Sequence, residues 1–395
     1  MLLVKDSLSP SEHHRFSLSS IEIDTEISFQ LRSDTYEDAE IKFTLKYPKS
    51  KIFSEYSVSV YLFKNKHFSQ KDIIDLRVNE IGPNSGRIGY FIRLDALFEN
   101  EILQLNQHIY PYVYYALEYI FSSTETIQTK EYELTSNPPN ITDFFDEDTI
   151  VLVLCNEYVS FNPKLKILDY LAPLYLHGFT WLECQTKIER FNNTEIISDN
   201  FDTVKQIVRP DGTYVLRINS PIDLLLGENF ITHLFKHLLQ IEIDSITKFI
   251  TLYQIIEISI SKIFHLKVQT KVCDNLSNLT SFKLKEFLGD IQKEKTRINS
   301  LLNEYSRPKS NLEIILREEI INFFNHVLDD DYSDPDKVSK LTLTDVYYDY
   351  RNKLVHNYRL LHRPGIDNEI TQDKIGKINE LTEVLVSQIV TYFKV

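Results

Sequence analysis

Hydrophobic and polar residues alternate with a period of two along much of the first half of the chain. The alternation covers Ile21 to Leu31, Ile41 to Tyr47 and Tyr56 to Phe63, which are rich in β-branched and aromatic residues. Because alternate side chains of a strand face opposite sides of a sheet, this period predicts half-buried strands. Further strands are predicted at 88–94, 110–120, 149–154 and 213–218, and a helix at 164–175. We therefore predict a β-rich or α+β region over residues 1–229, with a division near residues 137–140 left open.

From Phe230 onward, hydrophobic residues recur every three or four positions, which is the period of a helix. The pattern predicts one long helix, or two that meet near residues 242–245, and then a helix over residues 281–305. Two more helices begin at the capping boxes Ser310 to Glu313 and Thr342 to Asp345. The last helix carries an apolar stripe of Ile375, Ile378, Leu381, Leu385, Ile389 and Phe393. Residues 230–395 are therefore predicted to form an all-α bundle, which makes the whole chain an α+β protein.

The amino-acid composition argues against several classes of protein function. The chain has only 9 glycines in 395 residues, and they form neither a dinucleotide-binding fingerprint nor a P-loop. Its three cysteines are far apart, which is typical of a reducing cytoplasm and offers no thiolate zinc site. The longest apolar runs are too short to cross a bilayer. We therefore expect a cytoplasmic protein with no membrane contact, no cofactor and no metal.

Two acidic patterns in the first half match metal sites only in part. Glu40 and Lys42 have the E-x-K spacing of some metal-dependent nucleases, with Asp24 upstream, but on an amphipathic strand this pattern is typical of a solvated face. The acidic run 143–148 lacks the alternating ligands and the central glycine of a calcium loop, which favours an exposed turn.

Charge is distributed unevenly along the chain. The formal net charge is -14, of which residues 1–229 carry -13 and residues 230–395 carry -1. RNA would be repelled by the acidic first part and tolerated by the second. The acidic surface either confers solubility alone, or it meets a basic partner and keeps nucleic acid away.

The helix that begins at Thr342 carries the most distinctive chemistry. Residues three or four apart share a face of a helix. One face is an apolar stripe of Tyr347, Tyr350, Leu354 and Leu361. A second face carries Tyr348, Asn352, His356 and Arg359, with Arg351 at its margin. Because arginine can hold a phosphate by two hydrogen bonds and an imidazole can move a proton near neutral pH, this polar, aromatic and basic face is a candidate phosphate site.

The run Arg351-Asn352-Lys353-Leu354-Val355-His356 resembles the R-x4-6-H motif of the HEPN-domain family, in which a polar residue often follows the arginine. The resemblance covers roughly residues 240–395 and leaves the N-terminal part without a family. It rests on the Arg-Asn start, on the apolar pair before the histidine, on the penultimate position of the helix and on the helical surroundings.

The resemblance implies a metal-independent endoribonuclease in which the motif helices of two protomers build one composite site. His356 would then act as general acid or base, Arg351 would stabilise the charge on the phosphate in the transition state, and Asn352 would orient either group. The products would carry a 2',3'-cyclic phosphate. Homodimerisation through the C-terminal bundle is the corresponding expectation.

Further residues have supporting roles in this prediction. Tyr348, Arg359 and Lys353 would contact the RNA by stacking or through its backbone, although Tyr348 could equally be part of the packing. Glu257, on an otherwise apolar helix, is a candidate partner for Arg351.

HEPN ribonucleases with an additional N-terminal region resemble abortive-infection (Apea-like) and antiviral effectors and toxins. By analogy, residues 1–229 would sense a phage-derived trigger or a regulatory partner, or would restrain the nuclease. Two alternatives remain open: a non-catalytic HEPN module that dimerises or binds a nucleotide or partner, and a helical interaction protein with a fortuitous motif.

Overall fold

The computed structural model describes residues 2–5, 13–24, 26–35, 39–45, 57–79, 86–98, 103, 106–123, 140–155, 166–183, 188–219, 225, 228–270, 280–305, 311–356 and 366–393. The chain divides into two compact units. The N-terminal unit comprises residues 1–191, 198–220 and 232–241, and the C-terminal unit comprises residues 192–197, 221–231 and 242–395. A β-rich N-terminal half and a helical C-terminal region give the α+β class that the sequence predicts. The boundary expected after residue 229 falls inside α6 (Asn229–His233), which the two units share.

The first four strands form an antiparallel sheet in chain order: β1 (Leu2–Lys5), β2 (His13–Ile23), β3 (Ile27–Ser33) and β4 (Glu40–Leu45). The segment Ile21 to Leu31, predicted as one strand, is a hairpin instead. The Asp24 amide donates to the Glu26 carbonyl at 3.0 Å, and β2 and β3 pair on either side of this turn. Alternation continues through the turn because paired residues of neighbouring strands face the same side, so the period alone did not reveal the reversal.

Strand β4 shows how this sheet divides apolar from charged residues. Ile41, Phe43 and Leu45 are buried, whereas the residues between them face outward. On the outward face, Glu40 accepts a hydrogen bond from Arg32 at 2.7 Å, and Lys42 lies 3.9 Å from Glu22. The E-x-K spacing therefore lies on a solvated face.

A second sheet has six strands in the order β10-β6-β7-β8-β5-β9. Strand β10 is parallel to β6, and the other neighbours are antiparallel. The strands are β5 (Val58–Lys64), β6 (Ile73–Val78), β7 (Arg87–Arg93), β8 (Thr149–Cys155), β9 (Thr180–Leu182) and β10 (Tyr214–Ile218). The segments predicted around β5, β7, β8 and β10 are confirmed, and the sequence analysis missed β6 and β9.

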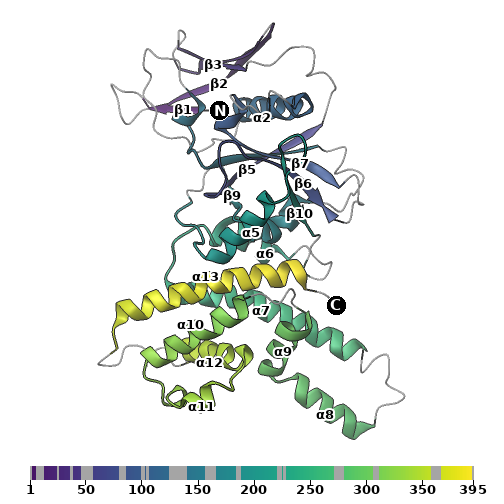
Figure 1. The fold of residues 1–395 in the computed structure, drawn as a ribbon, viewed down its shortest axis with the longest axis vertical. Helices are drawn as coiled ribbons and strands as arrows, with labels where there is room; N and C mark the ends of the chain where they lie inside the picture. The colour runs from purple at the N-terminus through teal and green to yellow at the C-terminus, as the bar shows by residue number, and fades with distance from the viewer. Residues whose placement is uncertain are drawn as a thin grey trace. The chain divides into compact units, whose positions relative to one another are not determined.

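Helix α2 (Tyr110–Ser122) lies between the two sheets (Figure 1) and replaces the strand predicted at 110–120. The prediction was wrong because aromatic and β-branched residues favour strands. The helical period was nevertheless present. Val113, Leu117 and Ile120 are fully buried at three- and four-residue spacings, and Pro111 occupies the first turn, where its missing amide hydrogen leaves no bond unmade. One apolar core joins both sheets through this helix.

The opposite face of the second sheet packs against a separate group of aromatic residues. The Phe91 and Phe179 rings stack with centroids 4.2 Å apart, and Phe63 and Phe201 pack around Phe179. These side chains come from the sheet, from the segment before β9 and from α5 (Glu195–Lys205). The helix predicted at 164–175 is present as a 3-10 turn and the short α4 (Leu171–Tyr175) over residues 167–175.

The C-terminal unit consists mainly of helices. They are α7 (Ser245–Val268), α8 (Ser281–Ile291), α9 (Glu294–Ser300), α10 (Leu312–His326), α11 (Pro335–Val338), α12 (Leu343–His356) and α13 (Asn368–Tyr392). The predicted helix over residues 281–305 is broken at Gln292 and Lys293, between α8 and α9. The chain also breaks before α7, where Asp244 caps the amides of Ile246 and Thr247, so two helices replace one long one.

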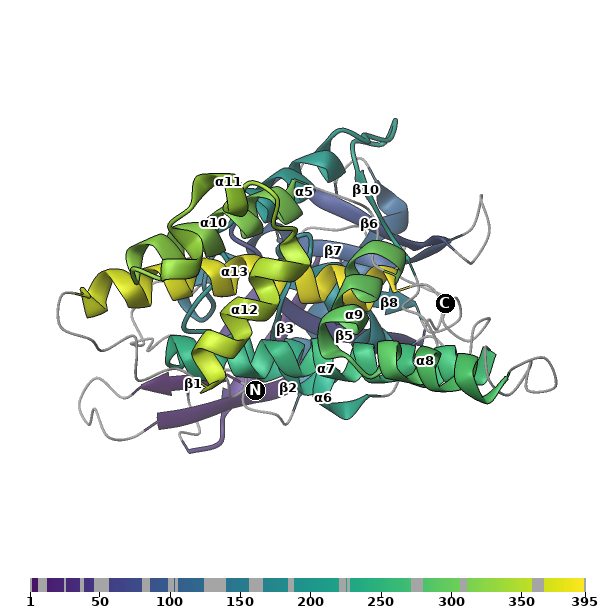
Figure 2. The ribbon, with the colours of Figure 1, turned by 90° about the horizontal axis from the view of Figure 1, so that it is seen from below.

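Helices α7 and α13 form the core of this unit, and α10 and α12 pack beside them (Figure 2). Between α7 and α13, the Lys248 ammonium lies 2.5 Å from the fully buried Glu383 carboxylate, which also accepts from Asn192 at 2.9 Å. Of the described helices, α7 alone is long and apolar enough to cross a membrane by length and composition. Core helices share that property, and α7 buries Phe249, Leu252 and other apolar residues inside the bundle.

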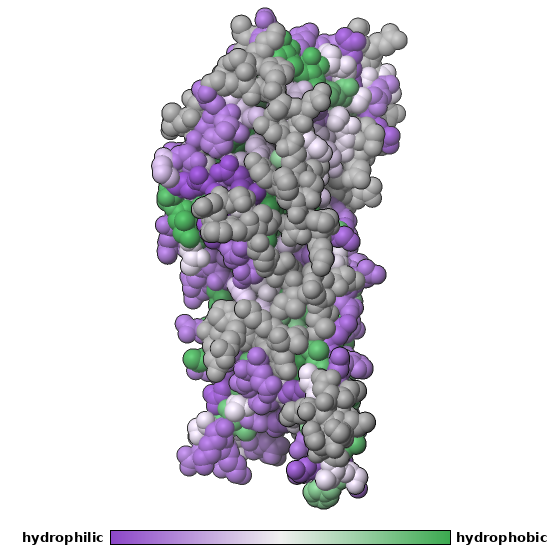
Figure 3. All heavy atoms as spheres, turned by 90° about the vertical axis from the view of Figure 1, so that its right-hand side faces the viewer, coloured by the Kyte–Doolittle hydropathy of each residue, from purple (hydrophilic) through white to green (hydrophobic). Residues whose placement is uncertain are grey.

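On the face that Figure 3 shows, the described residues are mostly hydrophilic, and the hydrophobic ones form small separate groups. Large exposed hydrophobic side chains in the C-terminal unit include Phe282, Leu328 and Val355. Of these three, Val355 directly precedes His356 in the chain.

Candidate functional site

The amino end of α12 and its buried stripe orient the helix. The Thr342 amide and hydroxyl donate to the Asp345 carboxylate at 2.7 and 2.6 Å, which is the capping box that the sequence predicts. On the buried side, the Tyr350 ring lies edge-on to Phe249 and to Phe323, with centroids 5.0 and 4.9 Å away. Tyr347 and Leu354 are buried on the same side, while Leu361 lies outside the described residues. This packing turns the motif residues away from the core.

Arg351 is the centre of the polar side. Its Nη1 atom lies 3.1 Å from His356 Nε2 and donates to Asn352 Oδ1 at 3.1 Å. A guanidinium can only donate, so this contact is a hydrogen bond when Nε2 carries no proton. The Arg351 side chain is 17% exposed, and His356 is exposed at the end of the helix. The structure therefore brings Arg351, Asn352 and His356 into one cluster at the surface.

Two carboxylates also approach Arg351. Its Nη2 atom lies 3.7 Å from Glu257 Oε1 of α7 and 3.8 Å from Glu294 Oε1 of α9. Glu257 is therefore placed beside the arginine, as the sequence analysis expected. The sequence analysis missed Glu294. The sequence predicts one continuous helix over residues 281–305, so nothing in it marks Glu294 as the first residue of α9.

A tyrosine completes the surroundings of the arginine. The guanidinium carbon lies 5.4 Å from the centre of the Tyr253 ring, within cation-π range. The Tyr253 hydroxyl donates to Glu294 at 2.7 Å, and burial, followed by this hydrogen bond, raises the pKa of the phenol. Tyr253 therefore stays neutral and fixes both the arginine and the acid. Tyr253 was not among the site residues that the sequence predicts.

The other residues expected on this face lie apart from the Arg351 cluster. The Lys353 ammonium binds Asp329 at 2.6 Å, with both side chains mostly buried. Tyr348 is half-buried and makes no contact with Arg351 or His356 among the described residues. Arg359 lies outside the described residues. The described part of the face thus contains one arginine, Arg351, with two acids beside it. It is less basic than the sequence predicts.

Three further observations bear on the chemistry of the chain. Among the described residues, no group of three or more His, Cys, Asp or Glu side chains could hold a metal ion. Cys155 is a buried free thiol, which removes it as a surface nucleophile. Comparison of the chain with family models, curated proteins and solved structures finds no match. The site must therefore be interpreted from its own geometry.

Proposed function

We propose that the chain is a metal-independent endoribonuclease of the HEPN type, with Arg351 and His356 as its catalytic residues. The observation that carries the proposal is the 3.1 Å approach of Arg351 Nη1 to His356 Nε2 at the exposed end of α12. One phosphate could contact both groups there. A guanidinium and a neutral imidazole are the two functions that cleavage through the ribose 2'-hydroxyl requires.

The geometry supports a simple sequence of events. A phosphate that binds Arg351 accepts the hydrogen bond that Nη1 would otherwise donate to His356. The lone pair of His356 Nε2 is then free. Nε2 then accepts the proton of the 2'-hydroxyl while the 2'-oxygen bonds to phosphorus. The bond from phosphorus to the 5'-oxygen breaks, and that oxygen takes a proton from an acid such as the imidazolium of a second copy. The products are a 2',3'-cyclic phosphate and a 5'-hydroxyl.

Asn352 acts as a positioning residue in this proposal. Its Oδ1 atom accepts from Nη1 and therefore helps to fix the plane of the guanidinium. Nη2 then keeps its position beside Glu257 and Glu294. A fixed planar donor matches two phosphate oxygens, which a flexible ammonium does not.

The proposal includes a two-fold homodimer through the C-terminal unit. Val355 is 41% exposed and stands beside the exposed His356, so self-association would cover an apolar side chain and bring two histidines together. Sedimentation at micromolar concentration tests this part. A strict monomer that still cleaves RNA would contradict it.

The chemical test is RNA cleavage by the purified full chain in excess chelator. We expect His356→Ala and Arg351→Ala to lower the rate by roughly two to four orders of magnitude, the usual loss when an acid-base group is removed. Arg351→Lys keeps the charge but loses the two-point hydrogen bonding, so we expect it to restore little activity.

Two substitutions in the same unit serve as matched controls. His265→Ala removes another exposed histidine, and Arg297→Ala removes another arginine that lies over an aromatic ring, Phe264 at 5.9 Å. Both should cleave at the rate of the unmodified chain. Cleavage that survives in His356→Ala, or that the chelator abolishes, would show the mechanism to be wrong.

One observation favours a second function, a non-catalytic module that dimerises or binds a nucleotide or protein partner. Glu257, Glu294 and Asn352 already surround Arg351, so its positive charge is balanced without any phosphate, although its buried Nε atom makes no hydrogen bond to a described residue. The absence of cleavage together with a stable dimer that Arg351→Ala disrupts would support this alternative.

The biological role that we propose is defence, as an abortive-infection or toxin effector that cleaves cellular RNA. It rests on the resemblance of residues 240–395 and on the acidic character of residues 1–229, which suits a regulatory region rather than an RNA-binding one. RNA sequencing of cells that express the full chain, compared with the Arg351→Ala variant, would identify the target. Identical RNA profiles during infection would remove this role.

A further inference from the structure

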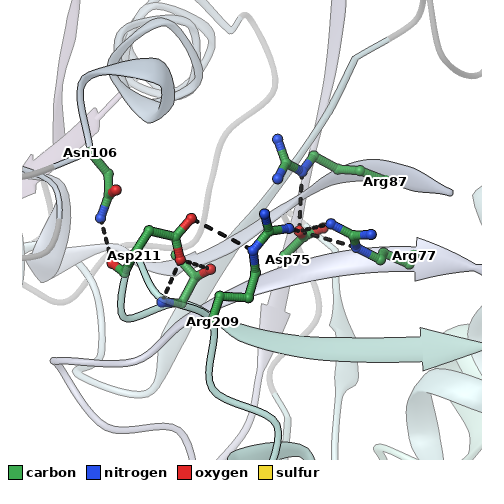
Figure 4. Close-up of polar contacts among 7 residues, drawn as sticks. Asp75, Arg77, Arg87, Asn106, Arg209 and Asp211 are labelled. Atoms are coloured by element: carbon green, nitrogen blue, oxygen red, sulfur yellow. Dashed lines mark hydrogen bonds and ion pairs between the residues drawn. The ribbon is translucent and has the colours of Figure 1, made fainter. Parts of the chain in front are cut away.

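The N-terminal unit contains an arginine cluster that the proposed nuclease does not use. Three guanidinium groups converge on the fully buried Asp75 of β6 (Figure 4). The Oδ2 atom of Asp75 accepts from Arg77 at 2.8 and 3.2 Å, from Arg87 at 3.1 Å and from Arg209 at 2.8 Å. The sequence analysis missed this cluster, because its members are as much as 134 residues apart.

The pairing of strands places two of these arginines. Arg77 lies opposite Arg87 and Asp75 lies opposite Tyr90, so their side chains share one face of the sheet. An irregularity between these pairs adds a residue to β7, which lets Arg87 and Tyr90, three positions apart, reach the same face.

A tight turn before β10 supplies the third arginine. The Asp211 carboxylate accepts from the amide and the hydroxyl of Thr213 at 3.0 and 2.6 Å, and Gly212 takes a φ of 83° that favours glycine. Asn106, just before the 3-10 turn Gln107–Ile109, donates to the Asp211 carbonyl at 2.7 Å. Arg209 is thus held over the sheet by local hydrogen bonds (Figure 4).

The cluster carries more positive than negative charge. Three guanidiniums face Asp75 and Asp211, whose Oδ2 atom lies 3.7 Å from Arg209 Nε, which leaves one surplus positive charge. The surplus stands out because residues 1–229 have a net charge of -13.

Polar groups of the cluster are also left without partners. Arg87 donates to Asp75 through Nε alone, and its two Nη groups make no hydrogen bond to a described residue. The buried Oδ1 atom of Asp75 and the buried hydroxyl of Tyr90 likewise lack a partner among the described residues. Buried polar groups are normally satisfied. The Nη groups of Arg87 and the Tyr90 hydroxyl are donors that an anion can satisfy, whereas the Asp75 oxygen is an acceptor that an anion cannot satisfy.

We propose that this cluster binds the phosphate group of a small molecule. The Arg87 and Arg209 side chains are 25% and 31% exposed, so a ligand can reach them from solvent. Planar guanidiniums match phosphate oxygens with paired hydrogen bonds, and a surplus charge favours an anion. An RNA strand fits less well, because the acidic surroundings repel a polyanion more strongly than a single phosphate. The site is independent of the nuclease proposed above.

Calorimetric titration of the full chain with inorganic phosphate and with adenosine 5'-monophosphate tests the proposal. We expect both to bind, and Arg87→Gln and Arg209→Gln each to weaken binding by about ten- to a hundredfold, the usual effect of one charged hydrogen bond. Arg209→Gln is the safer variant for folding, because that side chain is more exposed. Tighter binding of the nucleotide would identify an organic phosphate as ligand, and equal binding would identify free phosphate.

The matched control is Arg93→Gln. Arg93 lies on the same strand and pairs with Asp95, its Nε atom 2.9 Å from Oδ1, but does not touch Asp75. This variant should keep the affinity of the unmodified chain. Absence of phosphate binding in the folded chain, or equal binding by all variants, overturns the proposal. So does a loss of RNA binding in Arg87→Gln without loss of phosphate binding.

Discussion

The two units each place arginine beside carboxylates, but with opposite balance. In the N-terminal unit, three arginines share the buried Asp75 and leave positive charge to spare. In the C-terminal unit, the single Arg351 stands between Glu257 and Glu294, so negative charge is in excess. The acidic part of the chain thus contains the cationic cluster, and the near-neutral part contains the acidic one.

This contrast shows that the charge of a region does not determine the charge of its sites. The net charge of residues 1–229 acts at long range on the approach of a polyanion. The arginines around Asp75 act over hydrogen-bond distances, where burial strengthens each contact. We therefore expect Asp75 to matter for folding and the two glutamates near Arg351 to matter only for ligand affinity.

The largest expected effect tests this difference directly. Asp75→Asn should lower the free energy of unfolding of the N-terminal unit by about 3–5 kcal/mol, because it removes the buried carboxylate that three arginines share. Glu257→Gln should change the stability of its own unit by less than about 0.5 kcal/mol, because the Glu257 side chain is half exposed.

Fluorescence of the single tryptophan can measure the first change in urea. Trp181 is buried in β9 of the same sheet as Asp75, so its signal reports the N-terminal unit. Circular dichroism at helical wavelengths follows the C-terminal unit. If Asp75→Asn and Glu257→Gln lowered the free energy of unfolding equally, the expected difference between a buried and an exposed carboxylate would be wrong.

The fold class could be predicted from periodicity, since a strand period of two and a helix period near 3.6 are local properties of the sequence. The bundle helices at 312–326, 343–356 and 368–392 illustrate this. Periodicity failed where two local signals conflicted. At α2, the β propensity of five tyrosines outweighed the spacing of its buried residues.

The candidate site was predictable only where it is local. Arg351, Asn352 and His356 lie within one and a half turns of one helix, so their sequence spacing implied their contact. Glu294 and Tyr253 come from other helices and meet Arg351 only through packing. The Asp75 cluster had one usable sequence signal, two charged residues inside the apolar strand Ile73–Val78. A charged residue there requires a partner, but sequence alone does not name it.

A prediction of intermediate size concerns how the stability of the N-terminal unit depends on pH near the arginine cluster. His108 lies near Arg87 and Arg209, and burial, followed by the charge of Arg87, lowers its pKa below 6.5. Asp211 acts in the opposite direction but does not reverse the shift. The unfolded state therefore binds the proton first as the pH falls. Stability is fully present above about pH 6.5 and is lost as the pH falls toward the folded-state pKa.

The slope of the free energy of unfolding against pH should stay well below the limit of about 1.4 kcal/mol per pH unit that one proton allows. The burial of His108 is only partial, and solvent screens its interactions. Urea unfolding followed by Trp181 between pH 5 and pH 8 measures it, and His108→Gln should flatten the curve. The slope should also shrink in high salt. A stability that rises as the pH falls in this window would contradict the cationic surroundings of His108.

The smallest expected effect concerns the two glutamates beside Arg351. Glu294→Gln removes a negative charge 3.8 Å from Arg351 but keeps an oxygen that can accept the Tyr253 hydroxyl. The arginine should then attract a phosphate more strongly, and the KM for RNA should fall by about 1.4- to fivefold, as expected for a partly exposed ion pair worth about 0.2–1 kcal/mol. Glu257→Gln should act in the same direction and more weakly, since its side chain is 50% exposed against 22% for Glu294. Both effects should fade at high ionic strength, where exposed charges are screened. If instead Glu294→Gln lowers kcat and leaves KM unchanged, then Glu294 positions Arg351 for the reaction, and the acids around that arginine belong to the catalytic arrangement rather than opposing it.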